Sequence, residues 1–465
     1  MAKNDPGPLT FSTFHNVINN ELTSTAQSRH GINPPNKKPN PAVRVSTQED
    51  LNRAVTAAQQ AFLSWSKIPV GERRTAIYEF ANGIEANKDM FAKMLTAEQG
   101  KPLSQATTEV EMAVHWARTI PTIEIPITVL EESDEHEIIE RHTPMGVVGA
   151  IVPWNFPVLL AVGKIVPALY TGNTIILKPS PFTPYCDLKL AELAIQYFPT
   201  GVFQALSGDN DLGPIMTEHP GIDKISFTGS ILTGKRVMAS CAKTLKRLTL
   251  ELGGNDPVII CDDVDIDAII PTIGVLSFLC SSQICMMIKR LYVHEKIYDE
   301  FRDKLAKHVQ DLKVGEGTRP DTFIGPVQNS MQFDKAKDLF DSLSSEGLKP
   351  VPTLVDNPPD NSRVVVEEPF APILPLLKWS DENDVIARAN DSQTGLGASV
   401  WSSDIDRANR MALQLQAGSV WVNSHFQVAP NVPFGGHKAS SIGMEWGLTG
   451  LLGYCNTQSL WLKKK

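Results

Sequence analysis

The chain has no surplus of basic residues. Among its 465 residues, 43 are Lys or Arg and 52 are Asp or Glu, which gives a formal net charge of -9 at pH 7. A protein that binds nucleic acid or an anionic membrane needs a basic face to neutralise phosphates. The composition therefore argues against both kinds of partner.

Cysteine is also scarce, with six residues and no pair in CxxC spacing: Cys186, Cys241, Cys261, Cys280, Cys285 and Cys455. Such scattered cysteines are typical of free thiols rather than of a disulfide framework or a zinc site. His294, His425 and His437 occur singly, without ligand spacing, so we expect no metal. The start, "MAKNDPGPLTF", lacks the apolar core of a secretory signal, and we expect a cytoplasmic protein.

No long hydrophobic run continues without interruption. The stretch "PMGVVGAIVPWNFPVLLAVG" (Pro144–Gly163) is apolar enough to resemble a membrane helix, but Pro153, Asn155 and Pro157 lie in its middle. Prolines at these positions disrupt a continuous helix, so the stretch predicts a buried strand, a loop and the start of a helix.

The order of local patterns predicts an α/β protein. Ser46 and Glu49 have capping-box spacing before an amphipathic helix, and helical patterns recur at residues 72–84 and 106–117. From Gly146 to Asp262, helical patterns alternate with the β-rich runs "GVVGAIV", "TIILK", "VFQAL", "KISFTG", "RLTLEL" and "PVIIC". This alternation favours an open parallel sheet that binds ligands at the carboxyl ends of its strands. A second α/β region follows to about Ser440, and residues 125–143 have strand-like runs around an acidic turn.

A glycine-rich turn at "FTGSILTGKR" follows one predicted strand and begins a helix. Gly229, Gly234 and Lys235 match the spacing of a phosphate-binding loop, but Arg236 replaces the Ser or Thr that would hold Mg²⁺. This argues against a nucleotide triphosphatase. Free N–H groups at the helix start suit the pyrophosphate of a dinucleotide, although a plain strand-to-helix turn would use the same glycines.

Two cysteines in "FLCSSQICMMIKR" compete as nucleophile. Cys280 continues the helical face of Ile269, Ile273 and Leu276, which predicts a packed core residue. Cys285 follows a polar segment and precedes a strand, and such a loop is where an accessible thiol is expected.

Three polar residues end predicted strands of the parallel sheet. Glu251 ends "TLEL", where a carboxylate can act as a general base, although in isolation the pattern favours a surface strand-end glutamate. Asn155 lies in the rigid loop "PWNFP" and could donate to a developing oxyanion, or could be a turn asparagine. Lys178 could bond ribose hydroxyls, or could be an ordinary strand-end lysine.

Taken together, these motifs resemble a known family. "PWNFP", "KPS", "FTGS", "LELGG", "SQIC", "EEPFAP" and "PFGGHKAS" occur in the order and approximate spacing of the NAD(P)-dependent aldehyde dehydrogenases. The resemblance implies three-layer open parallel sheets, with a Rossmann-like cofactor domain (residues 1–124 and 145–253), an α/β catalytic domain (254–440) and a small β oligomerisation arm (125–144 and 441–465).

The resemblance also implies roles for individual residues. Cys285 would be the nucleophile, Glu251 the base for hydrolysis of a thioester and Asn155 the oxyanion donor, and Lys164 matches a recurrent lysine. The expected NAD or NADP site comprises Ile151, Pro153, Trp154, Lys178, Ser180, Gly229, Ser230, Gly234, Leu252, Glu368 and Phe370. The expected substrate tunnel comprises Phe156, Leu160, Gly163, Ile284, Met286, Val428 and Phe434.

Some positions depart from the family pattern. Ser282 and Ser441 stand where glycine is usual, Cys280 where asparagine is common, and Met444 where arginine is typical; we expect these changes to affect local packing more than catalysis. Pro181 replaces a frequent ribose-binding glutamate, which leaves both NAD and NADP open.

The substrate and the assembly follow from the same resemblance. Gly163 and Val428 replace bulky aromatic residues of many relatives, which predicts a roomy apolar tunnel for a bulky aliphatic or aromatic aldehyde, as in specialised metabolism. The alternatives are a CoA-acylating or phosphorylating relative, remotely a P-loop nucleotide hydrolase, or a binding protein that retains the fold without turnover. Exposed strand edges in the arm predict a homodimer or homotetramer.

Overall fold

The computed structural model describes residues 9–348, 350–351 and 353–464, and two large sheets organise them. The first sheet has eight strands in the order β2 (Glu21–Thr23), β1 (Asn16–Ile18), β9 (Phe203–Ala205), β8 (Thr174–Lys178), β7 (Val147–Ile151), β10 (Lys224–Thr228), β11 (Arg247–Glu251) and β21 (Ser441–Ile442). The five strands from β9 to β11 are parallel, and the edge strands pair antiparallel. The parallel sheet predicted from the alternating pattern is confirmed.

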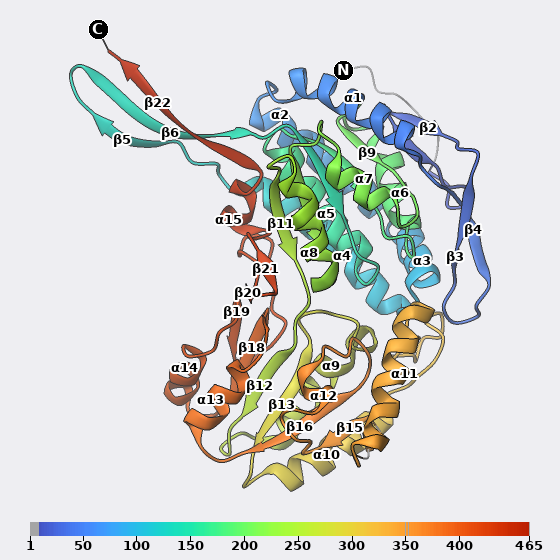
Figure 1. The fold of residues 1–465 in the computed structure, drawn as a ribbon, viewed down its shortest axis with the longest axis vertical. Helices are drawn as coiled ribbons and strands as arrows, with labels where there is room; N and C mark the ends of the chain where they lie inside the picture. The colour runs from blue at the N-terminus through green and yellow to red at the C-terminus, as the bar shows by residue number, and fades with distance from the viewer. Residues whose placement is uncertain (1–8, 349, 352, 465) are drawn as a thin grey trace.

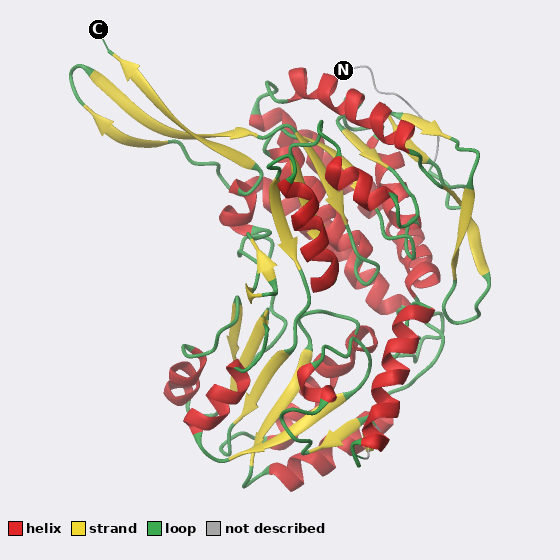
Figure 2. Cartoon of the chain, viewed as in Figure 1, coloured by secondary structure: helices red, strands yellow, loops and turns green. Residues whose placement is uncertain are grey.

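Helices cover both faces of this sheet and make three layers (Figure 2). One face packs against α1 (Gln48–Trp65), α7 (Leu212–Glu218) and α8 (Ile231–Ala242). The other packs against α2 (Val70–Ala86), α3 (Lys88–Gln99), α4 (Leu103–Thr119), α5 (Pro157–Tyr170) and α6 (Tyr185–Ala194), with the short 3-10 helix η1 (Ile120–Thr122) after α4. Both faces of the parallel strands are buried, which explains their continuous apolar runs.

The second sheet has seven strands in the order β14 (Pro350–Val351), β15 (Leu354–Asp356), β16 (Leu374–Trp379), β13 (Ile288–His294), β12 (Asp256–Ile260), β18 (Gly397–Trp401) and β19 (Ser419–Val422). All its pairings are parallel except that of β14. The helices after β11 in the chain are α9 (Ile266–Phe278), η2 (Leu279–Ser282), α10 (Tyr298–Asp311), α11 (Ser330–Ser345), α12 (Arg363–Val366), α13 (Glu382–Asn390), α14 (Ile405–Ala412) and α15 (Gly447–Leu452).

A three-stranded arm projects from the body (Figure 1). It consists of β5 (Thr128–Glu132), β6 (His136–Pro144) and β22 (Cys455–Lys463), with β6 in the middle. The predicted strands around the acidic turn are confirmed, and β22 pairs with β6 along its whole length. Two small two-stranded sheets are also present: the hairpin of β3 (Ser28–Ile32) with β4 (Pro39–Arg44), and the antiparallel pair of β17 (Thr394–Gly395) with β20 (His437–Lys438). The domain boundaries themselves remain a prediction.

The capping box of α1 lies one residue later than the sequence predicts. Thr47 is the N-cap, and it exchanges hydrogen bonds with Asp50. Ser46 is buried and accepts a hydrogen bond from Asn16 Nδ2 at 2.9 Å, which holds it outside the helix. The prediction of Ser46 and Glu49 was therefore wrong by one position, because a contact from a distant strand decides where the helix begins.

Among the helices of the described residues, none is long and apolar enough to cross a membrane. Within Pro144–Gly163 the structure has β7, a loop and the start of α5, as predicted.

Candidate active site

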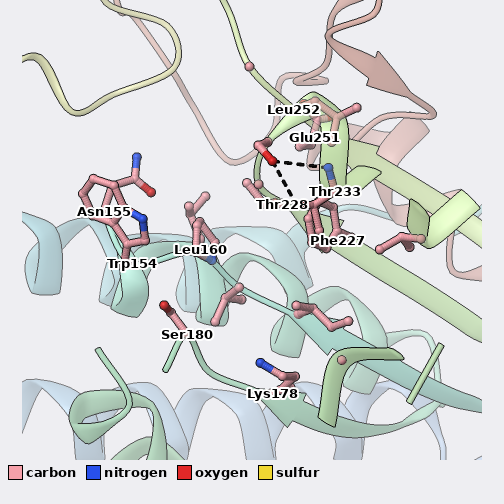
Figure 3. A pocket seen from close by; sticks show the side chains of 18 of the residues that line it. Trp154, Asn155, Leu160, Lys178, Ser180, Phe227, Thr228, Thr233, Glu251 and Leu252 are labelled. Atoms are coloured by element: carbon pink, nitrogen blue, oxygen red, sulfur yellow. Dashed lines mark hydrogen bonds between the residues drawn. The ribbon is translucent and has the colours of Figure 1, made fainter. Parts of the chain in front are cut away.

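A cleft of about 820 Å³ opens where β7, β8, β10 and β11 end. In Figure 3, Trp154 and Asn155 lie on one side of this cleft, Glu251 and Leu252 on the other, and Lys178 and Ser180 below. Most of the predicted site residues line it: Ile151, Pro153, Trp154, Asn155, Leu160, Lys164, Lys178, Ser180, Gly229, Ser230, Glu251, Leu252, Cys285, Glu368, Phe370 and Phe434. The carboxyl ends of parallel strands gather these side chains from distant parts of the sequence.

Six predicted residues do not line the cleft: Phe156, Gly163, Gly234, Ile284, Met286 and Val428. Gly234 packs under Leu252, and a Cβ at Gly234 would lie 2.5 Å from Leu252 Cδ2. Ile284 and Met286 are buried in the core, which Phe156 and Val428 also contact. These five residues therefore pack behind the cleft rather than face its interior, and the sixth, Gly163, lies against Trp446.

Cys285 lies in the loop between η2 and β13 and is the partly exposed cysteine of the cleft. Gly254 lets this loop approach β11, because a Cβ on Gly254 would lie 2.3 Å from the carbonyl oxygen of Cys285. Burial raises the pKa of the thiol, and Glu368, Asp256 and Glu251 raise it further. The thiol is therefore protonated at rest, and its activation needs a base or a change in its surroundings.

Cys280 is buried, as predicted, but it does not continue the preceding helix. The helix α9 ends at Phe278, and Cys280, Ser281 and Ser282 have φ values of 51°, 57° and 59°. Three consecutive left-handed residues without glycine are strained. Gln105 Oε1 accepts a hydrogen bond from Cys280 N at 3.1 Å, which takes the chain out of the helix.

A buried ammonium holds the same turn from the other side. Lys289 Nζ donates to the carbonyl oxygen of Ser282 and lies 5.6 Å from the ring centre of Phe370. Burial lowers the pKa of Lys289 to about 8. Its positive charge opposes the effect of the carboxylates on the pKa of Cys285.

Glu251 ends β11 and is almost fully buried. Its Oε2 accepts a hydrogen bond from Ser441 Oγ at 2.8 Å, whereas its Oε1 has no hydrogen-bond partner among the described residues. Burial and the neighbouring Glu445 raise the pKa of Glu251. Ser441 was expected to matter for packing rather than catalysis, but its hydroxyl directly contacts the candidate base.

The sequence did not reveal one further carboxylate of the cleft, Glu445. Lys164 Nζ lies 2.8 Å from Glu445 Oε1 and 2.8 Å from Ser226 Oγ. Tyr454 donates a further hydrogen bond to Glu445 Oε2 at 3.3 Å. A lysine inside the apolar helix α5 was the available signal, because a buried ammonium needs a charged partner.

Asn155 is held by both its backbone and its side chain. Its carbonyl oxygen accepts a hydrogen bond from Lys101 Nζ at 2.8 Å, and its Nδ2 donates to the carbonyl oxygen of Gln283 at 2.9 Å. An amide nitrogen carries two hydrogens, so a second N–H remains for another acceptor. The geometry fits an oxyanion donor in a fixed loop.

The other part of the cleft suits a dinucleotide. Ser230 is the N-cap of α8 and accepts a hydrogen bond from Thr233 N at 3.3 Å, so the start of this helix faces the cleft. Lys178 is buried, burial lowers its pKa to about 8, and its Nζ bonds only the carbonyl oxygen of Pro179 among the described residues. A helix N-terminus and a donor with free hydrogens fit pyrophosphate and ribose groups.

Glu368 and Phe370 line the part of the cleft that suits a dinucleotide. Glu368 Oε1 accepts a hydrogen bond from Gly254 N at 3.3 Å, and burial raises the pKa of Glu368 to about 7. Phe370 packs edge-on against Trp154 with ring centres 5.4 Å apart. No group of three or more His, Cys, Asp or Glu residues in the described chain is arranged to hold a metal ion.

The wall beyond Cys285 is aromatic. Phe434 and Trp446 stack with ring centres 4.9 Å apart, and Trp116 packs edge-on against Trp446 at 5.3 Å. A Cβ on Gly163 would lie 2.6 Å from Trp446 Nε1. The space expected beside Gly163 is thus filled by Trp446, which the sequence did not indicate.

Comparisons with known proteins agree with this architecture. The sequence profile of the aldehyde dehydrogenase family matches residues 22–460. The protein FUS7 of Gibberella fujikuroi is 41% identical over 470 residues, covering 98% of this chain and 100% of FUS7. The aldehyde dehydrogenase LUC3 of a Fusarium species is 39% identical over 472 residues, covering 98% of this chain and 100% of LUC3. The solved structure of a mutant aldehyde dehydrogenase from Bacillus cereus matches with a TM-score of 0.95 and 33% identity, and the match covers 97% of each chain.

These similarities define an oxidoreductase that oxidises aldehydes with NAD or NADP. The chain belongs to the aldehyde dehydrogenase family.

Proposed function

We propose that this enzyme oxidises a bulky apolar aldehyde to a carboxylic acid through a covalent intermediate on Cys285. The proposal rests on one observation, that a thiol, a carboxylate and an amide from three distant segments line the same cleft as a helix N-terminus. In this proposal the Cys285 thiol first gives its proton through Glu251 to solvent, and the resulting thiolate attacks the aldehyde carbon. The second N–H of Asn155 stabilises the oxygen that becomes negative. When bound, the nicotinamide ring supplies the acceptor for the hydride.

Glu251 completes the cycle by taking a proton from the water that hydrolyses the thioester. Its pKa is raised by burial, as suits a base that works near neutral pH. Retention of this carboxylate supports water, rather than CoA or phosphate, as the group that accepts the acyl chain. The product therefore discriminates between these reactions, because water yields a free carboxylic acid.

The residues expected to hold the cofactor are Lys178 at the adenosine ribose, Ser230 at the pyrophosphate and Glu368 at the nicotinamide ribose. Pro181, which lines the cleft, carries no carboxylate to repel a 2′-phosphate. Among related structures, one from Staphylococcus aureus contains NAD⁺ and one from Escherichia coli is described as NADP dependent. We propose that the enzyme accepts both cofactors.

The proposed substrate class follows from the aromatic wall. Phe434, Trp446 and Leu160 present apolar surface to the cleft, and aromatic rings stack favourably on aromatic substrates. Because Trp446 fills the space beside Gly163, we propose a flat aromatic or extended aliphatic aldehyde rather than a highly branched one.

The test compares Cys285→Ala with the matched variant Cys280→Ala. We expect Cys285→Ala to lose at least about 10³-fold in kcat, because no other thiol borders the cleft among the described residues. Cys280→Ala keeps the nucleophile and is expected to retain turnover. The measurement is NADH and NADPH formation with short, long and aromatic aldehydes, with identification of the acid. Full activity in Cys285→Ala, or an acyl-CoA product, would overturn the proposal.

A further inference from the structure

We propose that Ser441 is a positioning residue that determines which oxygen of Glu251 exchanges the proton. The inference rests on the proposed role of Glu251 as the base and deepens it.

Strand pairing fixes Ser441 opposite Glu251. The short strand β21 adds antiparallel to the edge of β11, with Ser441 facing Glu251 and Ile442 facing Leu250. Leu252 N also donates to the carbonyl oxygen of Ser440 at 2.8 Å, which extends the pairing past the strand end. The hydroxyl is therefore held by the backbone of the sheet rather than by a mobile loop.

A second contact determines the direction of the hydrogen bond. Gly436 N donates to Ser441 Oγ at 2.6 Å. Because a backbone N–H can only donate, Ser441 Oγ accepts there, and its own hydrogen is free to point at Glu251 Oε2, 2.8 Å away. Ser441 thus presents its hydroxyl hydrogen to the ionised form of this carboxylate.

The two oxygens of Glu251 consequently differ. One lone pair of Oε2 accepts from Ser441, which makes Oε2 the less basic oxygen, whereas Oε1 is buried and free of hydrogen bonds within the described residues. In this proposal the proton taken from water goes to Oε1, the more basic oxygen, and leaves from it. A carboxylate with one fixed oxygen also cannot rotate freely between orientations, so the basic oxygen stays in one place.

Three other ionisable groups act on this carboxyl. Glu445 disfavours its ionised form, Lys164 favours it, and the Cys285 thiol lies close enough to interact. The Ser441 hydrogen bond favours the ionised form. Removing the hydroxyl destabilises the carboxylate and raises the pKa of Glu251, so the basic form is reached only at higher pH.

The adjacent serine provides a matched control. Ser440 is also buried, but its Oγ donates to the carbonyl oxygen of Gly253 at 2.7 Å and accepts from Gly395 N at 3.0 Å. It does not touch Glu251. Ser440→Ala therefore removes a buried hydroxyl from the same segment without altering the base.

The experiment measures hydrolysis of the acyl-enzyme without a cofactor. p-Nitrophenyl acetate transfers its acetyl group to the Cys285 sulfur and releases p-nitrophenolate, and water then cleaves the carbon–sulfur bond to give acetate and the free thiol. The rate of this second step is followed from pH 5 to pH 10 in wild type, Ser441→Ala, Ser441→Thr and Ser440→Ala.

We expect the midpoint of the rising rate to move up by about one pH unit in Ser441→Ala, with about a tenfold loss of rate at pH 7. Ser441→Thr keeps the hydroxyl and should restore the wild-type midpoint. A wild-type midpoint in Ser441→Ala, or an equal shift in Ser440→Ala, would overturn the inference.

Two further variants separate this result from the proposed function. An acetyl burst that persists in Cys285→Ala, or wild-type hydrolysis in Glu251→Gln, would contradict the catalytic roles themselves. If Cys285→Ala loses the acetyl burst and Glu251→Gln loses the hydrolysis, but the pH profile of Ser441→Ala is not shifted, only the role of Ser441 is rejected.

Discussion

Trp446 is the single residue that most changes our interpretation of the substrate space. Gly163 alone predicts an open tunnel, yet the indole of Trp446 occupies the volume that a side chain at Gly163 would need. The two positions therefore act as a pair, in which a small residue on α5 accommodates a large one just before α15. Cores tolerate such exchanges when the total volume is conserved.

Trp446→Ala should open the cleft toward Gly163. We expect the ratio of kcat/KM for a branched aromatic aldehyde to that for a linear one to rise on the order of tenfold, because small changes of apolar volume alter discrimination by that amount. The measurement is steady-state kinetics with paired aldehydes. Trp154→Ala removes an indole that packs against Phe370 rather than against Gly163, and it should leave the ratio unchanged. An unchanged ratio in Trp446→Ala would contradict the pairing.

The sequence indicates some site residues and not others, for physical reasons. Cys285, Glu251 and Asn155 end strands or lie in short loops between patterns, so their exposure to a cleft can be inferred locally. Glu445 and Trp446 face the cleft because of contacts with Lys164 and Gly163, which are far away in the sequence. Partners of that kind are not visible in local periodicity.

At the level of elements, α4 supports the loop that carries Asn155 through one buried ion pair. Glu109 pairs with Lys101, and neither side chain is exposed. Glu109 Oε1 accepts hydrogen bonds from Val158 N and Leu159 N at the start of α5. Lys101 Nζ donates a hydrogen bond to the Asn155 carbonyl oxygen. The loop with Asn155 is thus fixed from both ends.

Glu109→Gln should destabilise the protein by about 3 kcal/mol, because it leaves the Lys101 ammonium buried without its partner. Chemical denaturation measures this difference, and kcat should fall with it as the Asn155 loop loosens. Glu111 on the same helix forms an exposed pair with Lys88, so Glu111→Gln is the matched control and should leave stability nearly unchanged. Equal stability of both variants would show that the buried pair does not support the loop.

Contacts between elements also explain why the sequence mispredicts two helix boundaries, the end of α9 and the start of α1. The apolar spacing of α9 continues to Cys280, but a left-handed turn is held there instead, since Cys280 N donates to Gln105 and Lys289 donates to Ser282. The helix start at Thr47 likewise depends on the contact between Ser46 and Asn16. In both cases the body of the helix was predictable from its sequence, and its end was set by tertiary contacts.

At the level of the whole molecule, the arm leaves apolar groups uncovered. Ile127, Val129, Leu130 and Trp461 are each at least half exposed, and both β5 and β22 are edge strands in this sheet. Exposed edges and apolar side chains favour association with another chain. We propose that the arm joins identical subunits.

Trp461→Lys should weaken that association, because it places a charge on exposed apolar surface of β22. We expect a lower mass by light scattering at micromolar concentration than for the wild type. Asn456→Lys puts the same charge on the opposite side of the strand, since alternate residues face opposite ways. An unchanged mass in Trp461→Lys would argue that this side of the arm does not meet a partner.

The strand β21 has a consequence for how the enzyme is made. The segment that supplies Ser441 to Glu251, Glu445 and Trp446 to the cleft, and β22 to the arm follows the last parallel strand of either sheet along the chain. A message with a premature stop codon shortly before this segment still encodes the parallel strands of both sheets, together with Cys285 and Glu251. Its product would carry these two residues but lack the hydrogen-bond partner of Glu251 and strand β22 of the arm, so the cleft is complete only after this segment has been synthesised.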